Sequence, residues 1–218
     1  MRKLERAIPR YAWLPLLSLI AANLVAYYGS RLFTLGAQRF ELSTPLDARV
    51  PFWPCMVVPY VLAYAQWALG FIVIARESRA RCDRVISGEL IAKLICLIAF
   101  VALPTTISRP EVTGDGLCER LVRLIYRMDA PVNLLPSIHC LDSWFCWRGA
   151  FCARRVPRGY KAGMLMLTLA VFASTVMIRQ HVLLDVVAAL IAAEAGLYLS
   201  RRLNAGRIFA RMRREGRQ

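Results

Sequence analysis

The sequence contains few histidines and few acidic residues, and it lacks paired cysteine motifs, internal repeats and low-complexity tracts. Two of its 218 residues are His, and 14 Asp and Glu stand against 29 Lys and Arg. None of the seven cysteines belongs to a Cys-x-x-Cys pair, so a zinc framework is not expected. The longest segment between apolar stretches covers residues 105–133, which leaves no room for a second globular domain.

Long apolar stretches dominate the rest of the chain. Hydrophobic residues make up 58% of it, and the mean hydropathy is +0.46. A soluble domain is typically about 45–50% apolar, so this excess indicates a membrane protein. Six stretches reach or approach the length of a membrane-crossing helix, and they cover residues 11–28, 51–75, 88–104, 134–152, 162–178 and 182–200.

These stretches predict an all-α fold, an integral membrane bundle of six transmembrane helices. It forms a single membrane domain over residues 1–218, which ends in a basic tail at 201–218. No convincing small-residue cleavage site follows the first stretch before Arg31, so we expect an uncleaved helix rather than a signal peptide.

Lys and Arg are distributed unevenly between alternate segments. The amino-terminal segment and the loops after the second and fourth stretches carry four each, and the tail carries seven. The three other loops carry eight together, and only Lys93 and Arg148 fall within apolar stretches. Because basic loops stay cytoplasmic, this asymmetry predicts that both termini are cytoplasmic. Topology and anionic inner-leaflet lipids then account for the net charge of +15, and nucleic-acid binding is not expected.

Ionisable residues within apolar stretches are functional candidates, because a charge in lipid is unfavourable. They are Glu89, Lys93, Asp142, Arg148, Asp185 and Glu194. Glu89 and Lys93 are spaced i, i+4 and are predicted to form a structural pair. Glu194 lies among Ala and Gly residues that suit close helix packing. Cys55 and Cys118 both fall in predicted outer segments and could form a disulfide, whereas most cysteines are interpreted as apolar fillers.

The two histidines fall at one predicted membrane face. His139 lies about one turn inside the fourth stretch, and His181 lies at the outer end of the sixth. His181 and Asp185 are four residues apart, so they share one face of a helix. A carboxylate beside an imidazole fixes its tautomer and stabilises the charge that develops when the other nitrogen attacks. A second histidine can then serve as a general acid.

Groups that suit phosphate occur in the same outer segments. Arg109 and Arg179 carry planar, permanently charged guanidinium groups that match phosphate oxygens. Pro136 and Ser137 open the fourth stretch and offer helix amides and a hydroxyl to an anion. With the histidines and Asp185, these residues describe a phosphoryl-transfer site without an obligatory metal or cofactor.

Three short motifs resemble those of the type 2 phosphatidic acid phosphatase superfamily. Pro136-Ser137-Ile138-His139 is similar to its Pro-Ser-x-His motif. His181-x-x-x-Asp185, with Ser174 seven residues upstream, resembles its Ser-Arg-x5-His-x3-Asp motif. Arg109-Pro110 resembles the end of its Lys-x6-Arg-Pro motif. The resemblance covers roughly residues 104–189, and the order of the motifs and the six-helix plan agree with it.

Two positions depart from the motifs of the superfamily. Ala102 stands at the lysine position of the first motif, and Thr175 stands at the arginine position after Ser174, where Arg179 is a candidate replacement for the charge. The segment 129–133, which ends in Asn133, resembles the inositol-phosphorylceramide-synthase-like branch. That branch includes enzymes that move a phospho-headgroup onto a lipid alcohol, so hydrolysis and headgroup transfer both stay open.

The resemblance implies a role for each site residue. His181 would be the nucleophile that forms a phosphohistidine, oriented by Asp185. His139 would protonate the leaving alkoxide and then activate water or an acceptor alcohol. The groups implied to hold the phosphoryl oxygens are Arg109, Arg179 and Ser137. The possible supporting residues are Asp142, which could orient His139 or pair with Arg148, and also Ser174 and Asn133.

The predicted partners are membrane lipids, with a lipid phosphate or phosphodiester as substrate at the outer face of a bacterial plasma membrane. The sequence carries no signal for an oligomeric state. One alternative is a transporter or scaffold that keeps the site without turnover, which predicts retained function after either histidine is changed to alanine. Another is an electron carrier in which His139 and His181 bind haem, which predicts visible absorbance in the purified protein.

Overall fold

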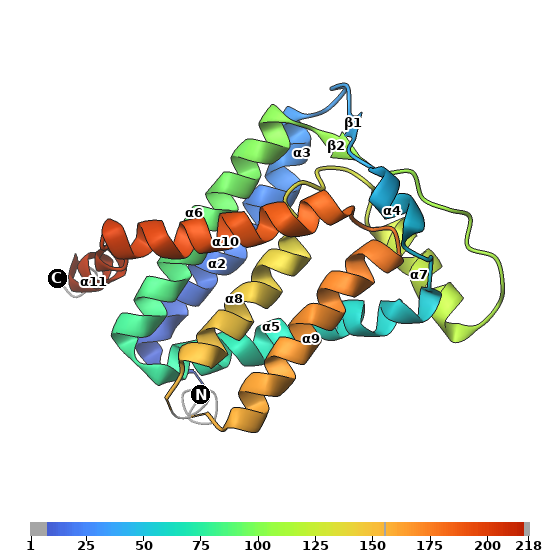
Figure 1. Cartoon of the computed structure of the whole chain (residues 1–218). Helices are drawn as coiled ribbons and strands as arrows, with labels where there is room; N and C mark the ends of the chain where they lie inside the picture. The colour runs from blue at the N-terminus through green and yellow to red at the C-terminus, as the bar shows by residue number, and fades with distance from the viewer. Residues whose placement is uncertain (1–7, 155, 216–218) are drawn as a thin grey trace.

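The chain folds into a bundle of helices with almost no β structure (Figure 1). The structure is a computed structural model that describes residues 8–154 and 156–215. Five of the basic residues that predict the topology lie outside these described residues, namely Arg2, Lys3, Arg6, Arg155 and Arg217.

The helices vary widely in length. The first long helix combines η1 (Arg10–Ala12), α2 (Trp13–Leu24), the π-helical η2 (Val25–Gly29) and α3 (Ser30–Phe33). After β1 (Phe40–Glu41), α4 (Pro45–Arg49) and η3 (Pro54–Met56) come α5 (Val57–Glu77) and α6 (Arg79–Ala102). Next are β2 (Thr105–Thr106), α7 (Leu117–Met128), α8 (Ile138–Cys152), α9 (Arg158–Met177), α10 (Leu183–Arg202) and α11 (Arg207–Glu215).

Among the residues that the structure describes, five helices are long and apolar enough to cross a membrane. They are Arg10–Phe33, Pro54–Glu77, Arg79–Ala102, Arg158–Met177 and Leu183–Arg202. This confirms the prediction of a helical protein with several apolar spans. The fourth predicted stretch forms α8, whose 15 residues extend about 22 Å, less than the ~30 Å hydrocarbon core of a bilayer. The crossing of six helices therefore stays a prediction.

The start of α8 explains why this helix is shorter than the apolar stretch. Pro136 has no amide hydrogen, and the Ser137 hydroxyl accepts a hydrogen bond from the Cys140 N–H at 3.4 Å, which caps the helix. Helices α5, α6, α9 and α10 all contact α8, which lies at the centre of the bundle (Figure 1). Leu141 and Phe145 are fully buried among them. The neighbouring helices thus shield much of α8 from lipid.

Small residues bring α6 and α10 into direct backbone contact. A Cβ atom added to Gly88 would lie 3.2 Å from the carbonyl oxygen of Gly196. A Cβ atom added to Gly196 would collide with the Gly88 carbonyl oxygen and with Ala92. Such close approach maximises dispersion contacts between helices in lipid, where no hydrophobic effect drives them together. The close packing expected from the small residues around Glu194 is confirmed.

A buried cation in the bundle pairs across helices. Lys93 of α6 forms an ion pair with Asp142 of α8, and its Nζ also donates to Asn23 Oδ1 at 2.8 Å. The carboxylate of Glu89 is fully buried and makes no hydrogen bond to the described residues. The predicted i, i+4 pair of Glu89 with Lys93 is therefore not formed, because a carboxylate on the neighbouring helix α8 reaches the ammonium group.

A second ion pair joins α8 to α10. Arg148 Nε donates to Glu194 Oε1 at 2.7 Å, and the Trp144 indole N–H donates to the same oxygen at 2.8 Å. Glu194 thus has partners that its sequence context did not reveal. Because Arg148 pairs with Glu194 and Asp142 pairs with Lys93, the suggested Asp142–Arg148 contact is absent.

The predicted cytoplasmic segments meet at one end of the bundle, which we call the basic end. Arg213 of α11 pairs with Asp83 of α6 and donates to the Tyr11 carbonyl at 3.1 Å. Arg81 donates to the Cys152 carbonyl at 2.7 Å, which joins the start of α6 to the end of α8. Part of the expected basic tail is helical, because it contains α11, and this helix packs against α6.

The predicted outer segments meet at the opposite end, which we call the histidine end. Strand β1 pairs in parallel with β2, with Phe40 opposite Thr105. The Trp53 N–H donates to the Met177 carbonyl at 3.1 Å, which joins the chain before α5 to the end of α9. The predicted cytoplasmic and outer segments therefore lie at opposite ends of the bundle, as their charge predicts. The side of the membrane that each end faces stays a prediction.

Replacing Gly196 by alanine is expected to destabilise the bundle, because the added methyl group has no space against α6. We expect the free energy of unfolding to fall by about 1–3 kcal/mol, as overpacking usually causes. The melting temperature of the purified protein in detergent measures this.

Gly163→Ala in α9 is the matched control for Gly196→Ala. Beyond its own helix backbone, no described residue lies within 4 Å of its added Cβ, so the higher helix propensity of alanine should stabilise the protein by up to ~1 kcal/mol. Equal melting temperatures for the two variants would contradict the close contact of α6 with α10.

Candidate active site

A cavity of about 540 Å³ opens at the histidine end of the bundle. His139 and His181 both line it, together with side chains of α7 and Asp129, which follows α7. Aromatic residues form much of the remaining wall; they are Tyr27, Tyr28, Tyr60, Tyr64 and Trp67. The structure thus brings the two histidines, which come from different segments, to one shared space.

His181 has a fixed orientation and a fixed tautomer. Its Nδ1 lies 3.0 Å from Asp185 Oδ2. Because a carboxylate only accepts hydrogen bonds, Nδ1 carries the hydrogen and Nε2 keeps its lone pair. Asp185 Oδ2 also accepts the Val182 N–H at 3.0 Å, and the Asp185 side chain is 1% exposed. Nε2 of His181 is therefore available as a nucleophile on a well-oriented ring.

A tight turn after α9 positions His181. Arg179 adopts a left-handed conformation with φ 52°, and the N–H groups of Gln180 and His181 both donate to the Thr175 carbonyl. Helix α10 begins two residues after His181, with Asp185 in its first turn. The predicted contact between His181 and Asp185 is confirmed, although the histidine precedes the helix.

His139 lies in the first turn of α8 against three aromatic rings. Its imidazole stacks on Tyr60 with ring centroids 4.2 Å apart and meets the edges of Tyr64 and Trp67. Its Nε2 is buried and has no hydrogen-bond partner among the described residues. The rings hold the plane of His139 beside the cavity, and no described residue satisfies its Nε2.

Ser137 connects the two histidine segments through its backbone. Its N–H donates to the Asp185 carbonyl at 3.1 Å, so the start of α8 is bound to the first turn of α10. Its hydroxyl caps α8, and its side chain is fully buried outside the cavity lining. In this structure Ser137 positions His139 and Asp185 relative to each other.

Arg109 binds the residue next to His181. Its guanidinium donates to Gln180 Oε1 at 2.6 Å and to the Asp129 carbonyl at 2.7 Å, and it lies over the Tyr126 ring. Burial lowers the pKa of Arg109 from its usual value, and the nearby Asp129 opposes this shift. The group stays cationic, because an arginine pKa begins far above neutrality. Arg109 thus places a positive charge beside the turn that carries His181.

Arg179 contacts the first outer loop. Its guanidinium donates to the carbonyls of Asp47 at 2.8 Å and Val50 at 2.7 Å. The sequence predicts that Arg179 holds phosphate oxygens, but both terminal nitrogens bind the backbone here. Arg179 therefore anchors the His181 turn to the loop around α4.

The three supporting candidates lie in different surroundings. Asn133 lines the cavity with φ 57°, and its amide donates to Ser30 Oγ at 2.9 Å while its oxygen has no partner among the described residues. Ser174 donates to the Val171 carbonyl of its own helix. Asp142 binds Lys93 and does not line the cavity. Only Asn133 shares the space of the histidines.

Sequence reasoning missed Asp47, whose carboxylate holds the start of α10. Its Oδ1 accepts the Leu183 N–H at 2.7 Å, and its Oδ2 accepts hydrogen bonds from Thr44. Burial alone would raise the pKa of Asp47, but the hydrogen bonds from Thr44 and Leu183 outweigh it and hold the pKa below its usual value. The run Thr44-Pro45-Leu46-Asp47 is a capping-box pattern that could have revealed the start of α4, whereas the hydrogen bond of Asp47 to α10 depends on tertiary packing.

The aromatic lining was also not predicted, although the sequence holds a signal for it. Tyr60, Tyr64 and Trp67 are spaced i, i+4 and i+7, which places them on one face of α5. In an apolar span that pattern is equally typical of a lipid-facing or core surface, so it identifies no cavity without the packing of α7 and α8 beside it.

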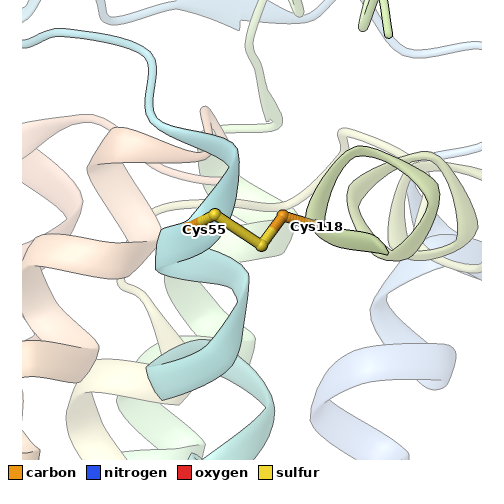
Figure 2. Close-up of a disulfide and its surroundings, with 2 residues drawn as sticks. All are labelled: Cys55 and Cys118. Atoms are coloured by element: carbon orange, nitrogen blue, oxygen red, sulfur yellow. A yellow bond between two sulfur atoms is a disulfide. The ribbon is translucent and has the colours of Figure 1, made fainter. Parts of the chain in front are cut away.

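A disulfide holds α7 against the start of α5. Cys118 near the beginning of α7 is bonded to Cys55 in η3 (Figure 2). Leu121, Leu124 and Ile125 of α7 line the cavity. The disulfide considered from the sequence is therefore present, and it ties one wall of the cavity to the helix that carries the aromatic wall.

The arrangement contains the parts of an acid–base and nucleophilic site. It has an imidazole with a free Nε2 and a buried carboxylate partner, a second imidazole on the same cavity, and an arginine bound to Gln180, the residue before the first imidazole. No protein family, curated protein or solved structure matches the chain, so the geometry is the basis for a functional interpretation.

Replacing Asp47 by alanine is expected to destabilise the histidine end by about 1–2 kcal/mol, because α10 loses its side-chain cap. Since the folded pKa of Asp47 lies below the usual 3.8, its stabilisation is fully present above that value and is lost as the pH falls through the folded pKa. The difference in melting temperature between wild type and variant should therefore be constant near neutrality and shrink below about pH 4.

Asp115→Ala is the control for Asp47→Ala, since this carboxylate in the same half of the molecule is 93% exposed. A pH-independent difference for Asp47→Ala, or an equal effect of Asp115→Ala, would contradict the capping role.

Proposed function

We propose that this protein is a membrane enzyme that transfers a phosphoryl or phospho-headgroup from an amphiphilic phosphoester through a phosphohistidine at His181. One observation carries the proposal: His139 and His181 line the same cavity, and His181 is hydrogen-bonded to Asp185 so that its Nε2 is free. The resemblance of the three motifs to the type 2 phosphatidic acid phosphatase superfamily supports the same chemistry.

In the first step, Nε2 of His181 attacks the phosphorus of the substrate. A P–N bond forms, the P–O bond to the leaving alkoxide breaks, and protonated His139 gives its proton to that alkoxide. The positive charge that develops on His181 is stabilised by Asp185, which accepts the hydrogen bond from Nδ1. The products of this step are a free alcohol and the phosphohistidine.

In the second step, an acceptor hydroxyl attacks the phosphohistidine. His139, now neutral, takes the proton of that hydroxyl, an O–P bond forms, and the P–N bond breaks to restore His181. Water as acceptor gives hydrolysis, and a lipid alcohol gives transfer. Arg109 contributes positive charge beside the reacting turn through its bond to Gln180, which favours the anionic transition state.

Transfer of a phospho-headgroup is the second candidate, and the lining of the cavity favours it. Asp129 is the charged residue among the described cavity-lining side chains, and the aromatic and apolar side chains form most of the wall. A phosphomonoester carries up to two negative charges and needs several cationic partners, whereas a phosphodiester carries one. A wall with this composition suits a phosphodiester lipid better.

The proposal places the cavity at the outer face of a bacterial plasma membrane, with six crossings and both termini inside. The asymmetry of Lys and Arg supports this orientation, because the basic segments gather at the end remote from the histidines. Membrane lipids supply the substrate there, and the proposed chemistry needs no cofactor and no nucleic acid.

Changing His181 to alanine is expected to lower turnover by at least about 10³-fold and to abolish any acid-labile phosphoenzyme, because the nucleophile is lost. The purified protein should be assayed on lipid phosphates and lipid phosphodiesters, with free phosphate and transferred headgroup measured separately. Turnover and phosphoenzyme that both persist in His181→Ala would overturn the mechanism.

Changing His139 to alanine tests the role of the general acid separately from the role of the nucleophile, His181. With a nitrophenyl phosphoester, whose leaving group needs no proton, His139→Ala should still form the phosphoenzyme and accumulate it, because the base of the second step is missing. His181→Ala should form none on the same compound. The control for purification and assay handling is Asp115→Asn, a change at an exposed carboxylate that does not line the cavity, and its activity should equal that of the wild type.

A further inference from the structure

A second cavity of about 490 Å³ lies at the basic end of the bundle. Its walls come from the start of α6, the end of α8 with the following loop, and the end of α10. Five arginines line it, namely Arg81, Arg84, Arg148, Arg154 and Arg201, and Glu77 is the carboxylate among the described lining residues. Arginines far apart in the sequence thus converge on one space.

Two of these arginines have partners within the protein. Arg148 is bound to Glu194, and Arg81 donates to the Cys152 carbonyl and lies 3.8 Å from Glu77. The side chains of the other three make no hydrogen bond or ion pair to the residues that the structure describes; they are Arg84, Arg154 and Arg201. Three guanidinium groups around this cavity therefore lack a counter-charge.

Such a cluster attracts anions, although Arg84, Arg154 and Arg201 are exposed and hydrated by water. The buried apolar side chains of Val85 and Leu197 in the same wall reduce the screening by water of an anion bound there. A guanidinium presents paired N–H donors that match phosphate oxygens, and several of them together favour a group with more than one negative charge. Basic pockets between spans at the cytoplasmic side suit the headgroups of anionic lipids.

We propose that this arginine cavity is a binding site for a phosphate-bearing anion with two or more negative charges. Arg84 and Arg201 provide the principal contacts, because each lies on a helix and forms no ion pair with a carboxylate of the described residues. A phospholipid with an exposed phosphate and a soluble phosphate share this chemistry. The site lies at the end opposite to the histidines, so it does not depend on the proposed transfer reaction.

The test compares ligands on the full-length protein in a neutral detergent. The probes are dioctanoyl phosphatidic acid, inorganic phosphate and dioctanoyl phosphatidylcholine, and the readouts are binding affinity by native mass spectrometry and the shift in melting temperature. Phosphatidic acid should bind and stabilise the wild type, and its affinity should fall as salt rises. Phosphatidylcholine should bind at least about tenfold more weakly, since its phosphate carries one charge that the choline neutralises.

The decisive variant is Arg84→Gln with Arg201→Gln, which should weaken phosphatidic acid binding on the order of tenfold or more. The matched control is Arg120→Gln with Arg127→Gln, which removes the same charge from α7 at the other end and should leave binding unchanged. The double lysine variant of Arg84 and Arg201 keeps the charge and should retain part of the affinity.

The probes also distinguish the two sources of the anion. Tighter binding of phosphatidic acid than of inorganic phosphate identifies a lipid headgroup site, and equal affinities identify a site for soluble phosphate compounds. Equal binding of phosphatidic acid to wild type and Arg84→Gln/Arg201→Gln, with both proteins eluting as a single folded species, would overturn the proposal. Because phosphatidic acid is also a candidate substrate at the histidine end, the comparison is made with His181→Ala in both the parent protein and the double glutamine variant. A difference in affinity that persists there belongs to the arginine cavity and is separate from the fate of the proposed enzyme activity.

Discussion

The histidine end depends on how the first turn of α10 satisfies its backbone amides. Asp185 Oδ2 accepts the Val182 N–H and lies 3.0 Å from His181 Nδ1, while Asp47 accepts the Leu183 N–H. The Asp185 carbonyl in turn accepts the N–H that precedes α8. One helix start thus joins the first outer loop, α8 and the candidate nucleophile. Because free amide groups at a buried helix start are unfavourable, the side chains that satisfy them are also the ones that fix the site.

The sequence predicted those features that depend on local spacing or on overall composition. Apolar stretches located the long helices, because crossing lipid requires length and hydrophobicity that few other structures need. The His181–Asp185 contact followed from a spacing of four residues. Gly88 and Gly196 lie where α6 touches α10, as the small residues near Glu194 indicated. For the apolar helices and the His181–Asp185 contact, a short segment contains the physical cause, whereas the contact of Gly88 with Gly196 also needs the packing of two distant helices.

The roles of the charged side chains could not be predicted in the same way. The sequence gives Lys93 a carboxylate one turn away, yet its partner is on α8, because burial favours whichever acceptor the packing brings to the ammonium group. Arg179 resembles a phosphate ligand in its spacing from His181, but a left-handed turn directs it to two carbonyls. Long flexible side chains reach partners within several ångströms, so tertiary packing rather than spacing decides their contacts.

The arginines at the two ends of the bundle differ in whether their side chains have hydrogen-bond acceptors within the described protein. At the histidine end, Arg109 and Arg179 are bound to amide and carbonyl oxygens, so their charge fixes loops and acts on the cavity from beside it. At the basic end, Arg84 and Arg201 have no such acceptor among the described residues. Orientation in a membrane requires only that arginines be numerous in a segment, and it does not require them to surround one cavity. Their convergence therefore goes beyond topology, and a bound anion is the physical reason for it that their geometry supports.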